Sequence, residues 1–206
     1  MKALVFGDVH GDVFALEALK RKAKDADVIL CLGDLTIFGE GLPLLLEIVN
    51  EFPKPVYIIH GNHEIKTEME EEVNRLENIT FIHKKMITQD KHTIIGYGGD
   101  GFSRRDEEFE EQAKEWKSKM KNPDDTIVLL HGPPSNTRLD VPFEDHHSGS
   151  DSYREFIEDL QPKIAFVGHI HECEGKTDRI GNTIIHNPGP EGTILDLEKT
   201  TSAFNI

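Results

Sequence analysis

Metal-competent side chains recur where the apolar segments of this chain end, and this feature constrains its fold more than any other. The first apolar segment, residues 2–6, is followed by Asp8 and His10. In an extended chain, side chains two positions apart point the same way, so this pair faces one point in space. Four later apolar segments also end in such side chains, each beside a glycine. They end in Gly33-Asp34, Gly61-Asn62-His63, His131-Gly132 and Gly168-His169-Ile170-His171.

Strands alternate with helices over the first part of the chain, which indicates an α/β fold with a parallel sheet. Residues 2–6, 27–34 and 56–64 are predicted as strands. Asp12 can cap a helix after the first of them, and a helix opens at Leu42 after the second. Ligands of open α/β sheets bind beyond the carboxyl ends of the strands, so the polar residues are expected to meet there.

The rest of the chain is predicted to continue the mixed pattern. Residues 79–85 and 92–99 are predicted as an antiparallel pair, with Ser103 capping a helix after it. Ser152 and Glu155 fit a capping box for a further helix. Additional strands are predicted at 126–134, 163–171, 182–190 and 193–198.

The bulk composition excludes several classes of protein. No linker or composition break divides the 206 residues, so residues 1–206 are predicted as one domain. No apolar run approaches the roughly 20 residues of a membrane helix, and two cysteines favour a cytoplasmic location. The formal charge of −15 argues against nucleic acid or an anionic membrane as a partner.

Each strand-end motif has an ordinary structural explanation, such as a turn or a hydrogen-bonded histidine, but all five together indicate a metal site. Apart from His63, the set contains two carboxylates, an asparagine and four histidines, with no thiolate. Such ligands suit Mn²⁺, Fe²⁺, Co²⁺, Ni²⁺ or Zn²⁺. Seven ligands are too many for one ion, which predicts two ions sharing a carboxylate, as in enzymes that displace groups at phosphorus.

The motifs GDVHG (7–11), GD (33–34), GNHE (61–64), HGPP (131–134) and GHIH (168–171) resemble, in order and spacing, those of the calcineurin-like metallophosphoesterases. The likeness extends over residues 7–171 and continues through HNPGP (186–190). It is greatest to a small prokaryotic class of predicted phosphoesterases that is distantly related to cyclic-nucleotide phosphodiesterases. The resemblance implies a four-layer fold of two packed mixed β-sheets flanked by helices.

The resemblance also implies roles for individual residues. Asp34 would bridge two divalent ions, of which Mn²⁺ is the expected kind, and a hydroxide held between them would attack phosphorus. His63 would contact the phosphate of a small ester substrate and protonate the leaving oxygen. One ion would be held by Asp8, His10 and His171, and the other by Asn62, His131 and His169.

One departure from the family pattern bears on the substrate. Protein Ser/Thr phosphatases carry Asp-Arg-Gly shortly after the second motif, whereas this chain has GDLTIFGEG (33–41). A phosphate-binding arginine and an aspartate to orient His63 are therefore missing, and Glu64, as a strand neighbour, is expected to point away. A diester monoanion needs less positive charge than a monoester dianion, which favours a phosphodiesterase. Arginines that could still fold in from loops are Arg104, Arg105 and Arg138.

Three alternatives to a phosphodiesterase stay open. They are a phosphomonoesterase such as a protein phosphatase, a nuclease, and a non-catalytic protein-binding scaffold of the same fold. Other residues near the motifs have more ordinary expectations. His60 is expected to be packed or to contact a ligand, and His83 and His92 to be exposed on a hairpin. The long loop at 138–151 is a candidate cover for the substrate, although a solvated connection is the simpler expectation.

Overall fold

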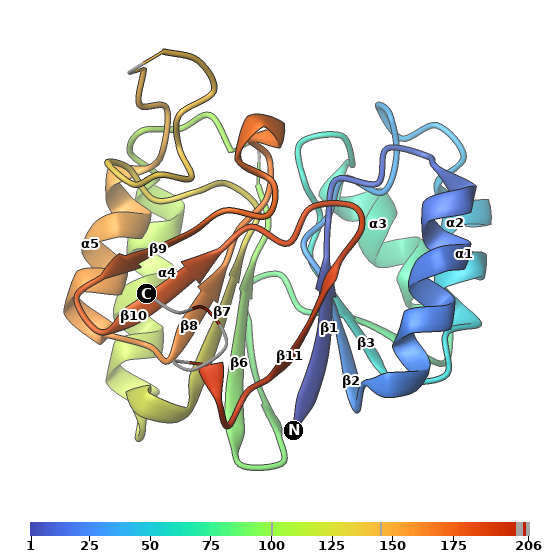
Figure 1. Cartoon of the computed structure of the whole chain (residues 1–206), viewed down its shortest axis with the longest axis horizontal. Helices are drawn as coiled ribbons and strands as arrows, with labels where there is room; N and C mark the ends of the chain where they lie inside the picture. Colours follow the sequence, from blue (N-terminus) through green and yellow to red (C-terminus); the bar gives the residue numbers. More distant parts are fainter. Residues whose placement is uncertain (100, 145, 201–203, 205–206) are drawn as a thin grey trace.

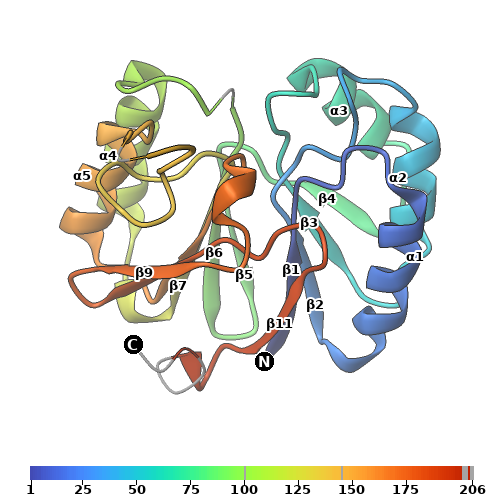
Figure 2. The ribbon, with the colours of Figure 1, turned by 45° about the horizontal axis from the view of Figure 1, so that its top comes forward.

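The computed structural model describes residues 1–99, 101–144, 146–200 and 204. Two β-sheets pack face to face, and helices cover the outer face of each (Figure 1). Figure 2 shows the layers from above, with α1 to α3 on one side and α4 and α5 on the other. The predicted four-layer α/β fold with two mixed sheets is therefore confirmed.

The first sheet has the strand order β11-β1-β2-β3-β4. Its parallel strands are β1 (Lys2–Phe6), β2 (Val28–Cys31), β3 (Val56–Ile58) and β4 (Ile79–Phe81), and β11 (Thr193–Asp196) runs antiparallel to β1. The connections carry α1 (Val13–Lys22), α2 (Leu42–Asn50) and α3 (Lys66–Val73), with a short 3₁₀ turn at Ala23–Asp25. Asp12 caps α1 through its side chain, as predicted, because its Oδ1 accepts from the Ala15 N–H at 3.0 Å.

The second sheet has the order β5-β6-β7-β8-β10-β9. Its strands are β5 (Lys85–Gln89), β6 (His92–Tyr97), β7 (Thr126–Leu130), β8 (Ile164–Phe166), β9 (Thr177–Ile180) and β10 (Thr183–His186). Strands β6, β7, β8 and β10 are parallel, and the edge strands are antiparallel. The outer face packs against α4 (Glu107–Lys119) and α5 (Asp151–Leu160), and 3₁₀ turns lie at Pro123–Asp125 and His171–Cys173.

The inner faces of the two sheets share one apolar core. Val5 and Leu30 of the first sheet pack there with Ile127, Leu129 and Phe166 of the second, and all are fully buried. Burying a side chain of this size stabilises the fold by about 1.5–3 kcal/mol. Because both faces of the central strands are covered, these strands are continuous apolar runs. This packing fixes the carboxyl ends of both sets of strands relative to each other.

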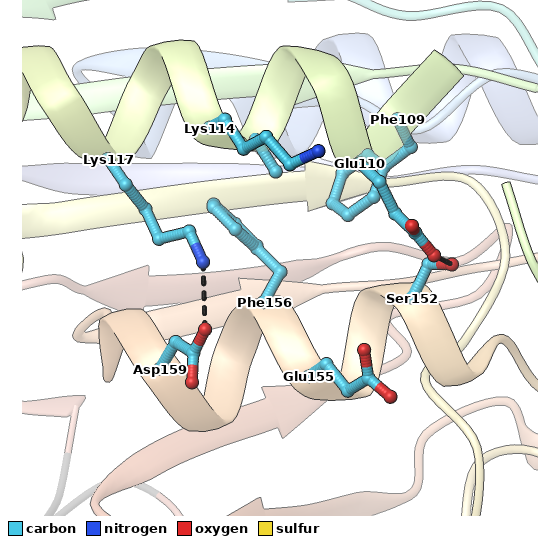
Figure 3. Close-up of a pocket in the computed structure, with 9 residues that line it drawn as sticks. Phe109, Glu110, Lys114, Lys117, Ser152, Glu155, Phe156 and Asp159 are labelled. Carbon is cyan, nitrogen blue, oxygen red and sulfur yellow. Dashed lines mark hydrogen bonds and ion pairs between the residues drawn. The ribbon is translucent and has the colours of Figure 1, made fainter. Parts of the chain in front are cut away.

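A groove of about 140 Å³ lies between α4 and α5, on the outside of the second sheet (Figure 3). Lys117 Nζ pairs across it with Asp159 at 2.8 Å, and Ser152 donates to Glu110 at 2.6 Å. Exposed ion pairs of this kind contribute little to stability. All of its lining residues come from these two helices, so it is separate from the strand ends.

One strand pairing and two helix caps, predicted at Ser103 and Ser152, are wrong. Most of the predicted strand at 79–85 does not pair with 92–99: β4 joins the first sheet beside β3, and the hairpin partner of β6 is β5, which begins at Lys85 opposite Gly96. The chain crosses between the sheets near Lys84, whose left-handed φ of 58° ends the extended run. Helix α4 begins one turn later than predicted, with Asp106 as its cap, and α5 is capped by Ser150.

The surroundings of several other residues also differ from prediction. His92 is fully buried, with Nε2 3.0 Å from a Glu198 carboxylate oxygen, instead of being exposed. In the long loop, buried Asp140 accepts hydrogen bonds from the backbone N–H groups of Asn136, Thr137 and Gly149. None of the helices in the described ranges combines the length and apolarity required to cross a bilayer.

Candidate metal centre

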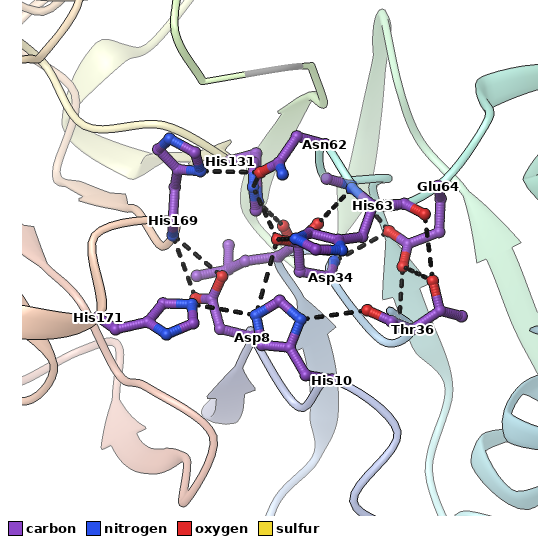
Figure 4. A network of polar contacts seen from close by, with 12 residues as sticks. Asp8, His10, Asp34, Thr36, Asn62, His63, Glu64, His131, His169 and His171 are labelled. Carbon is purple, nitrogen blue, oxygen red and sulfur yellow. Dashed lines mark hydrogen bonds and ion pairs between the residues drawn. The ribbon is translucent and has the colours of Figure 1, made fainter. Parts of the chain in front are cut away.

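All eight predicted site residues converge where the parallel strands of both sheets end (Figure 4). From the first sheet, Asp8 and His10 follow β1, Asp34 follows β2, and Asn62 and His63 follow β3. From the second sheet, His131 follows β7, and His169 and His171 follow β8. Residues from opposite ends of the sequence thus meet at one point, because the two sheets end on the same side of the molecule.

The donor atoms fall into overlapping groups. Three sets have ligand atoms within 4.8 Å of one another: Asp8, His10 and His171; Asp34, His131 and His169; and His10, Asp34 and His63. The side-chain oxygen of Asn62 joins the second set, at 3.0 Å from His131 Nε2 and 2.8 Å from His169 Nδ1. The first two sets contain side chains predicted for the two metal positions, whose assignment stays a prediction.

Asp34 lies between these sets. Its Oδ1 accepts a hydrogen bond from the His63 backbone N–H at 2.9 Å, which fixes the carboxylate. Its Oδ2 then faces His131 Nε2 at 3.5 Å and His10 Nε2 at 3.8 Å. A carboxylate oxygen between two groups of nitrogen ligands is placed as a bridging ligand would be.

The outer nitrogen of two histidines fixes which nitrogen faces the centre. His10 Nδ1 lies 3.1 Å from the Thr36 carbonyl oxygen, and His131 Nδ1 lies 2.9 Å from that of Leu32. A carbonyl can only accept, so Nδ1 carries a proton in both rings. In the neutral rings the lone pair is on Nε2, which faces the centre. Metal-binding histidines are commonly oriented by such a hydrogen bond.

His63 has the opposite arrangement. Its Nδ1 accepts a hydrogen bond from the Phe38 backbone N–H at 3.1 Å, so in the neutral ring the proton is on Nε2. Nε2 lies 4.0 Å from Asp34 Oδ2 and therefore presents an N–H to the centre instead of a lone pair. The group that orients His63 is thus a backbone amide, within the segment where protein phosphatases have Asp-Arg-Gly.

Sequence reasoning missed the role of Glu64, which is buried beneath the centre. Its Oε2 accepts from the N–H groups of Asp34 and Gly61, and its Oε1 accepts from the N–H and the hydroxyl of Thr36, all between 2.8 and 3.0 Å (Figure 4). The carboxylate therefore ties the loop after β2 to the loop after β3. A glutamate directly after a predicted site histidine was the available indication.

The backbone of the centre is strained. Asp8, His10, Asp34 and His169 have left-handed φ angles of 56°, 48°, 50° and 69°. Non-glycine residues rarely adopt this conformation, and such strain gathers at functional sites. The neighbouring glycines are needed for space: a Cβ on Gly61 would lie 2.0 Å from Asp34 Oδ1, and one on Gly168 2.5 Å from Asp8 Oδ2.

The electrostatics of the centre favour cations. Burial raises the pKa of Asp8. Burial opposes ionisation of Asp34 as well, but the hydrogen bond and charge of His131 outweigh it and lower the pKa of Asp34 to about 2. Burial likewise opposes a charged His131, yet its hydrogen bond to Asp34 raises the pKa of His131 to about 9. A divalent ion bound here would replace that proton, because metal ligation requires a neutral imidazole.

The three loop arginines considered from the sequence do not complete the site. Arg104 pairs with Asp151 at 2.9 Å, and Arg105 forms a two-pronged pair with Glu155 at 2.6 and 2.7 Å. Arg138 is exposed. Within the described ranges, the hydrogen bonds of the eight site residues involve no lysine or arginine side chain.

The donor set fits borderline divalent ions. It consists of imidazole nitrogens and oxygens alone, and neither Cys31 nor Cys173 belongs to the groups of potential ligands. Such a set suits Mn²⁺, Fe²⁺ or Zn²⁺ better than thiolate-seeking ions. His10 Nε2 and His171 Nε2 lie 3.0 Å apart, close enough to share one ion.

The model of the calcineurin-like phosphoesterase family matches residues 1–173. An uncharacterized protein of Methanocaldococcus jannaschii, MJ1162, is 33% identical over 202 residues, covering 93% of this chain and 89% of the relative. The 3',5'-cyclic adenosine monophosphate phosphodiesterase CpdA of Haemophilus influenzae is 27% identical over 175 residues, covering 76% and 59%. TT1561 of Thermus thermophilus, a solved structure, superposes with a TM-score of 0.79 at 19% identity, covering 96% and 94% of the two chains.

The family match therefore agrees with the fold and with the convergence of aspartate, asparagine and histidine side chains at the strand ends. The solved structure supports the fold, and the family model spans every predicted site residue. On this evidence the chain belongs to the calcineurin-like phosphoesterase family.

Proposed function

We propose that this protein is a metal-dependent phosphodiesterase that holds two divalent cations, with Mn²⁺ the expected ion, and cleaves small phosphodiesters. The observation that carries the proposal is the set of potential ligand atoms that face the centre around Asp34, together with the inward N–H of His63. The similarity to CpdA, whose name states a cyclic-nucleotide phosphodiesterase, supports a diester substrate.

In this proposal Asp8, His10 and His171 hold one ion, Asn62, His131 and His169 hold the other, and Asp34 contacts both. When bound, two divalent ions supply Lewis-acid activation of water and neutralise charge on the phosphoryl oxygens. The protein's own contribution is rigid placement, because hydrogen bonds from or to the backbone hold Asp34, His10 and His131.

His63 directs a proton at the reacting phosphate. The Phe38 N–H keeps the lone pair on Nδ1, so the proton on Nε2 points toward the centre. From this position Nε2 is proposed to donate to the leaving oxygen, the acid role implied by the family resemblance. Positioned proton donors of this kind typically contribute 10²- to 10⁴-fold to the rate.

The charge around the centre supports a diester over a monoester. A monoester dianion is usually bound by a guanidinium in addition to metals, and the nearby Arg104 and Arg105 are paired with carboxylates elsewhere. A diester carries one negative charge and needs less compensation.

The buried, unpaired cysteines agree with the cytoplasmic location predicted from the sequence, which cell fractionation would test.

The test compares hydrolysis of bis-p-nitrophenyl phosphate and p-nitrophenyl phosphate by metal-stripped protein before and after Mn²⁺ is added. We expect Mn²⁺-dependent cleavage with the diester preferred. His63→Ala should lower kcat by about 10²- to 10⁴-fold while the bound metal stays the same. His146→Ala, which alters an exposed histidine of the long loop, is the matched control.

Other results would change the assignment. Preference for the monoester would favour a phosphomonoesterase. Two tightly bound metals with no hydrolysis of either compound would favour the non-catalytic scaffold. Full activity in His63→Ala would remove His63 from the mechanism and leave the metal assignment intact.

A further inference from the structure

A second cavity opens directly beside the metal centre. It has a volume of about 310 Å³ and lies between the starts of α1 and α2, on the right-hand side of Figure 1. His10, one of the predicted metal ligands, forms part of its wall. Its other walls include Val13, Ile37, Glu40, Leu44 and Leu45. We refer to this cavity as the α1–α2 groove.

The walls of the groove present apolar side chains to solvent. Val13 is 40% exposed, Ile37 50% and Leu44 59%. Exposed apolar side chains are ordinary when scattered singly, but clusters of them commonly mark binding sites. Here they gather in a groove whose wall includes His10, so the groove adjoins the proposed reaction centre.

Phe38 follows Ile37 of the groove wall and contacts the proposed proton donor His63. Its ring is 83% exposed and lies 4.5 Å, centre to centre, from the His63 ring, while its backbone N–H holds His63 Nδ1. Its φ is 50°, an uncommon conformation for a bulky residue that glycine would adopt at no cost. A strained, exposed phenylalanine over the proposed proton donor contributes little to the core, so its ring is available for a ligand.

The charge of the groove defines its occupant. Glu40 places a carboxylate in the wall, and the wall contains no lysine or arginine among its described residues. A second phosphate or carboxylate would therefore be repelled, whereas an uncharged ring would bury apolar surface against Leu44 and Ile37. The volume lies at the low end for ligand pockets, which are about 300–1,000 Å³.

We propose that the α1–α2 groove, together with the Phe38 ring, binds an uncharged aromatic group that an ester oxygen links to the phosphorus of the substrate. The inference rests on the proposed function in one respect, namely that the phosphate binds at the metal centre. It specifies the substrate class further, as phosphodiesters with an aromatic ester group and no second anionic group on the groove side.

The test measures binding, so it does not depend on turnover. Mn²⁺-loaded protein is titrated calorimetrically with phenylphosphonate and with methylphosphonate, which share the phosphonate and differ in the group attached to phosphorus. We expect phenylphosphonate to bind about 10-fold more tightly, because its ring buries apolar area in the groove. Inorganic phosphate should compete with both compounds.

One variant acts on the groove wall, and the other acts on the Phe38 ring. Leu44→Ser replaces an exposed apolar side chain of α2, and Phe38→Gly removes the ring while retaining the backbone N–H and the left-handed φ. Each should reduce the preference for the phenyl compound to about 2-fold or less, with the loss confined to that compound. Phe14→Ala is the matched control, since Phe14 is 88% exposed on α1 and does not line the groove.

The outcomes separate the two proposals. Binding of both phosphonates with the same preference in the wild type, Leu44→Ser and Phe38→Gly would overturn the groove assignment alone. If neither phosphonate binds the Mn²⁺-loaded protein and inorganic phosphate does not bind either, the proposed function is overturned. The groove assignment falls with it. A lost phenyl preference in Phe14→Ala would also contradict the groove, because it would show a general surface effect.

Discussion

The two sheets supply the metal centre in different ways. The loops after β1, β2 and β3 carry five of the site residues, and hydrogen bonds among these loops, above all those to Glu64, hold them together. The ends of β7 and β8 carry three histidines, and two of them are held by the first sheet instead. The His169 N–H donates to Asp8 Oδ1 at 3.0 Å, and His131 Nδ1 to the Leu32 carbonyl at 2.9 Å.

The centre therefore has a self-supporting part, held by the first-sheet loops, and a docked part, contributed by the second sheet. The site residues of the first sheet are placed by local hydrogen bonds, whereas those of the second sheet depend on the packing of one sheet on the other. Substitutions can therefore be chosen to disturb both parts, the first part alone, or the second sheet alone.

The largest effect is expected from Asp34→Asn, which acts where the two parts meet. Loss of the bridging charge removes a ligand from both proposed metal positions, so metal content should fall from two ions to one or none. Mn²⁺-dependent diester cleavage should fall by at least about 100-fold, beyond the usual cost of removing a residue that only supports a ligand. Metal analysis after desalting measures the metal content, and kinetic assays measure the diester cleavage. Asp12→Asn, which retains a capping side chain, is the control. Two tightly bound ions with full activity would refute the bridging assignment.

A smaller effect is expected from Glu64→Gln, which disturbs the self-supporting part. Each Glu64 oxygen accepts hydrogen bonds from two donors. The glutamine side chain would place its NH₂ group at one of these two positions, where it would face donors that it cannot accept from. The free energy of unfolding should fall by about 1–3 kcal/mol, and Mn²⁺ affinity by about 10- to 100-fold. Urea denaturation and Mn²⁺ titration test this, with the exposed α3 residue in Glu68→Gln as control. Unchanged metal affinity would mean that the first-sheet loops are held by other contacts.

The smallest effect concerns the second sheet and depends on pH. Burial lowers the pKa of His186 in β10 to about 4, against 6.5 for an unperturbed histidine. Between these two pKa values the unfolded chain binds more protons than the folded protein does. The contribution of neutral His186 to the free energy of unfolding is therefore complete above pH 6.5 and is lost as the pH falls. The loss between pH 7 and pH 5 should be about 2 kcal/mol.

His186→Asn should remove that share of the pH dependence, because asparagine has no proton to take up in this range. Its amide can replace the Nδ1 contact to the Lys176 carbonyl, which lies at 3.1 Å. Urea denaturation at pH 5, 6 and 7 measures the slope, and His146→Asn in the exposed loop is the control. An unchanged slope in His186→Asn would mean that other groups determine the acid sensitivity of the second sheet.

The sequence was sufficient to predict the sheet ends and the gathering of the site residues. Buried parallel strands are continuous apolar runs, and the residues after them must turn, so Asp8, Asp34 and His131 could be placed at one edge. The pattern works because strand direction alone brings such residues together. Their identities as ligands stay a prediction, but their proximity is a property of the fold.

The middle of the chain could not be predicted in the same way. Helix α3 buries only Met69 and Val73, and its many glutamates hide the helical period. Without that helix, the β3-α3-β4 unit was not recognised, and β4 was assigned to the wrong strand pair. The break at Lys84 depends on a backbone conformation that lysine does not favour and that its sequence neighbours do not reveal.

The supports of the centre were missed for a further reason. Glu64 and the Phe38 N–H act across the gap between two loops, through hydrogen bonds that depend on the loop conformations. Alternation along a strand predicted that Glu64 points away from the metals. It does so, and there it meets the amides of the neighbouring loop. Contacts of this kind follow from tertiary structure and have no signature in strand or helix periodicity.

The left-handed backbone at Asp8, His10, Asp34 and His169 has a consequence for the history of related chains. Each such position costs about 1–3 kcal/mol, and glycine would relieve most of it. A descendant freed from metal binding would gain stability by accepting glycine at these positions, so selection for stability alone would erase the motif. Aspartate and histidine retained at these positions would therefore indicate a use of those side chains other than stability. The residues at these positions thus distinguish relatives that keep the candidate site from relatives that have lost it.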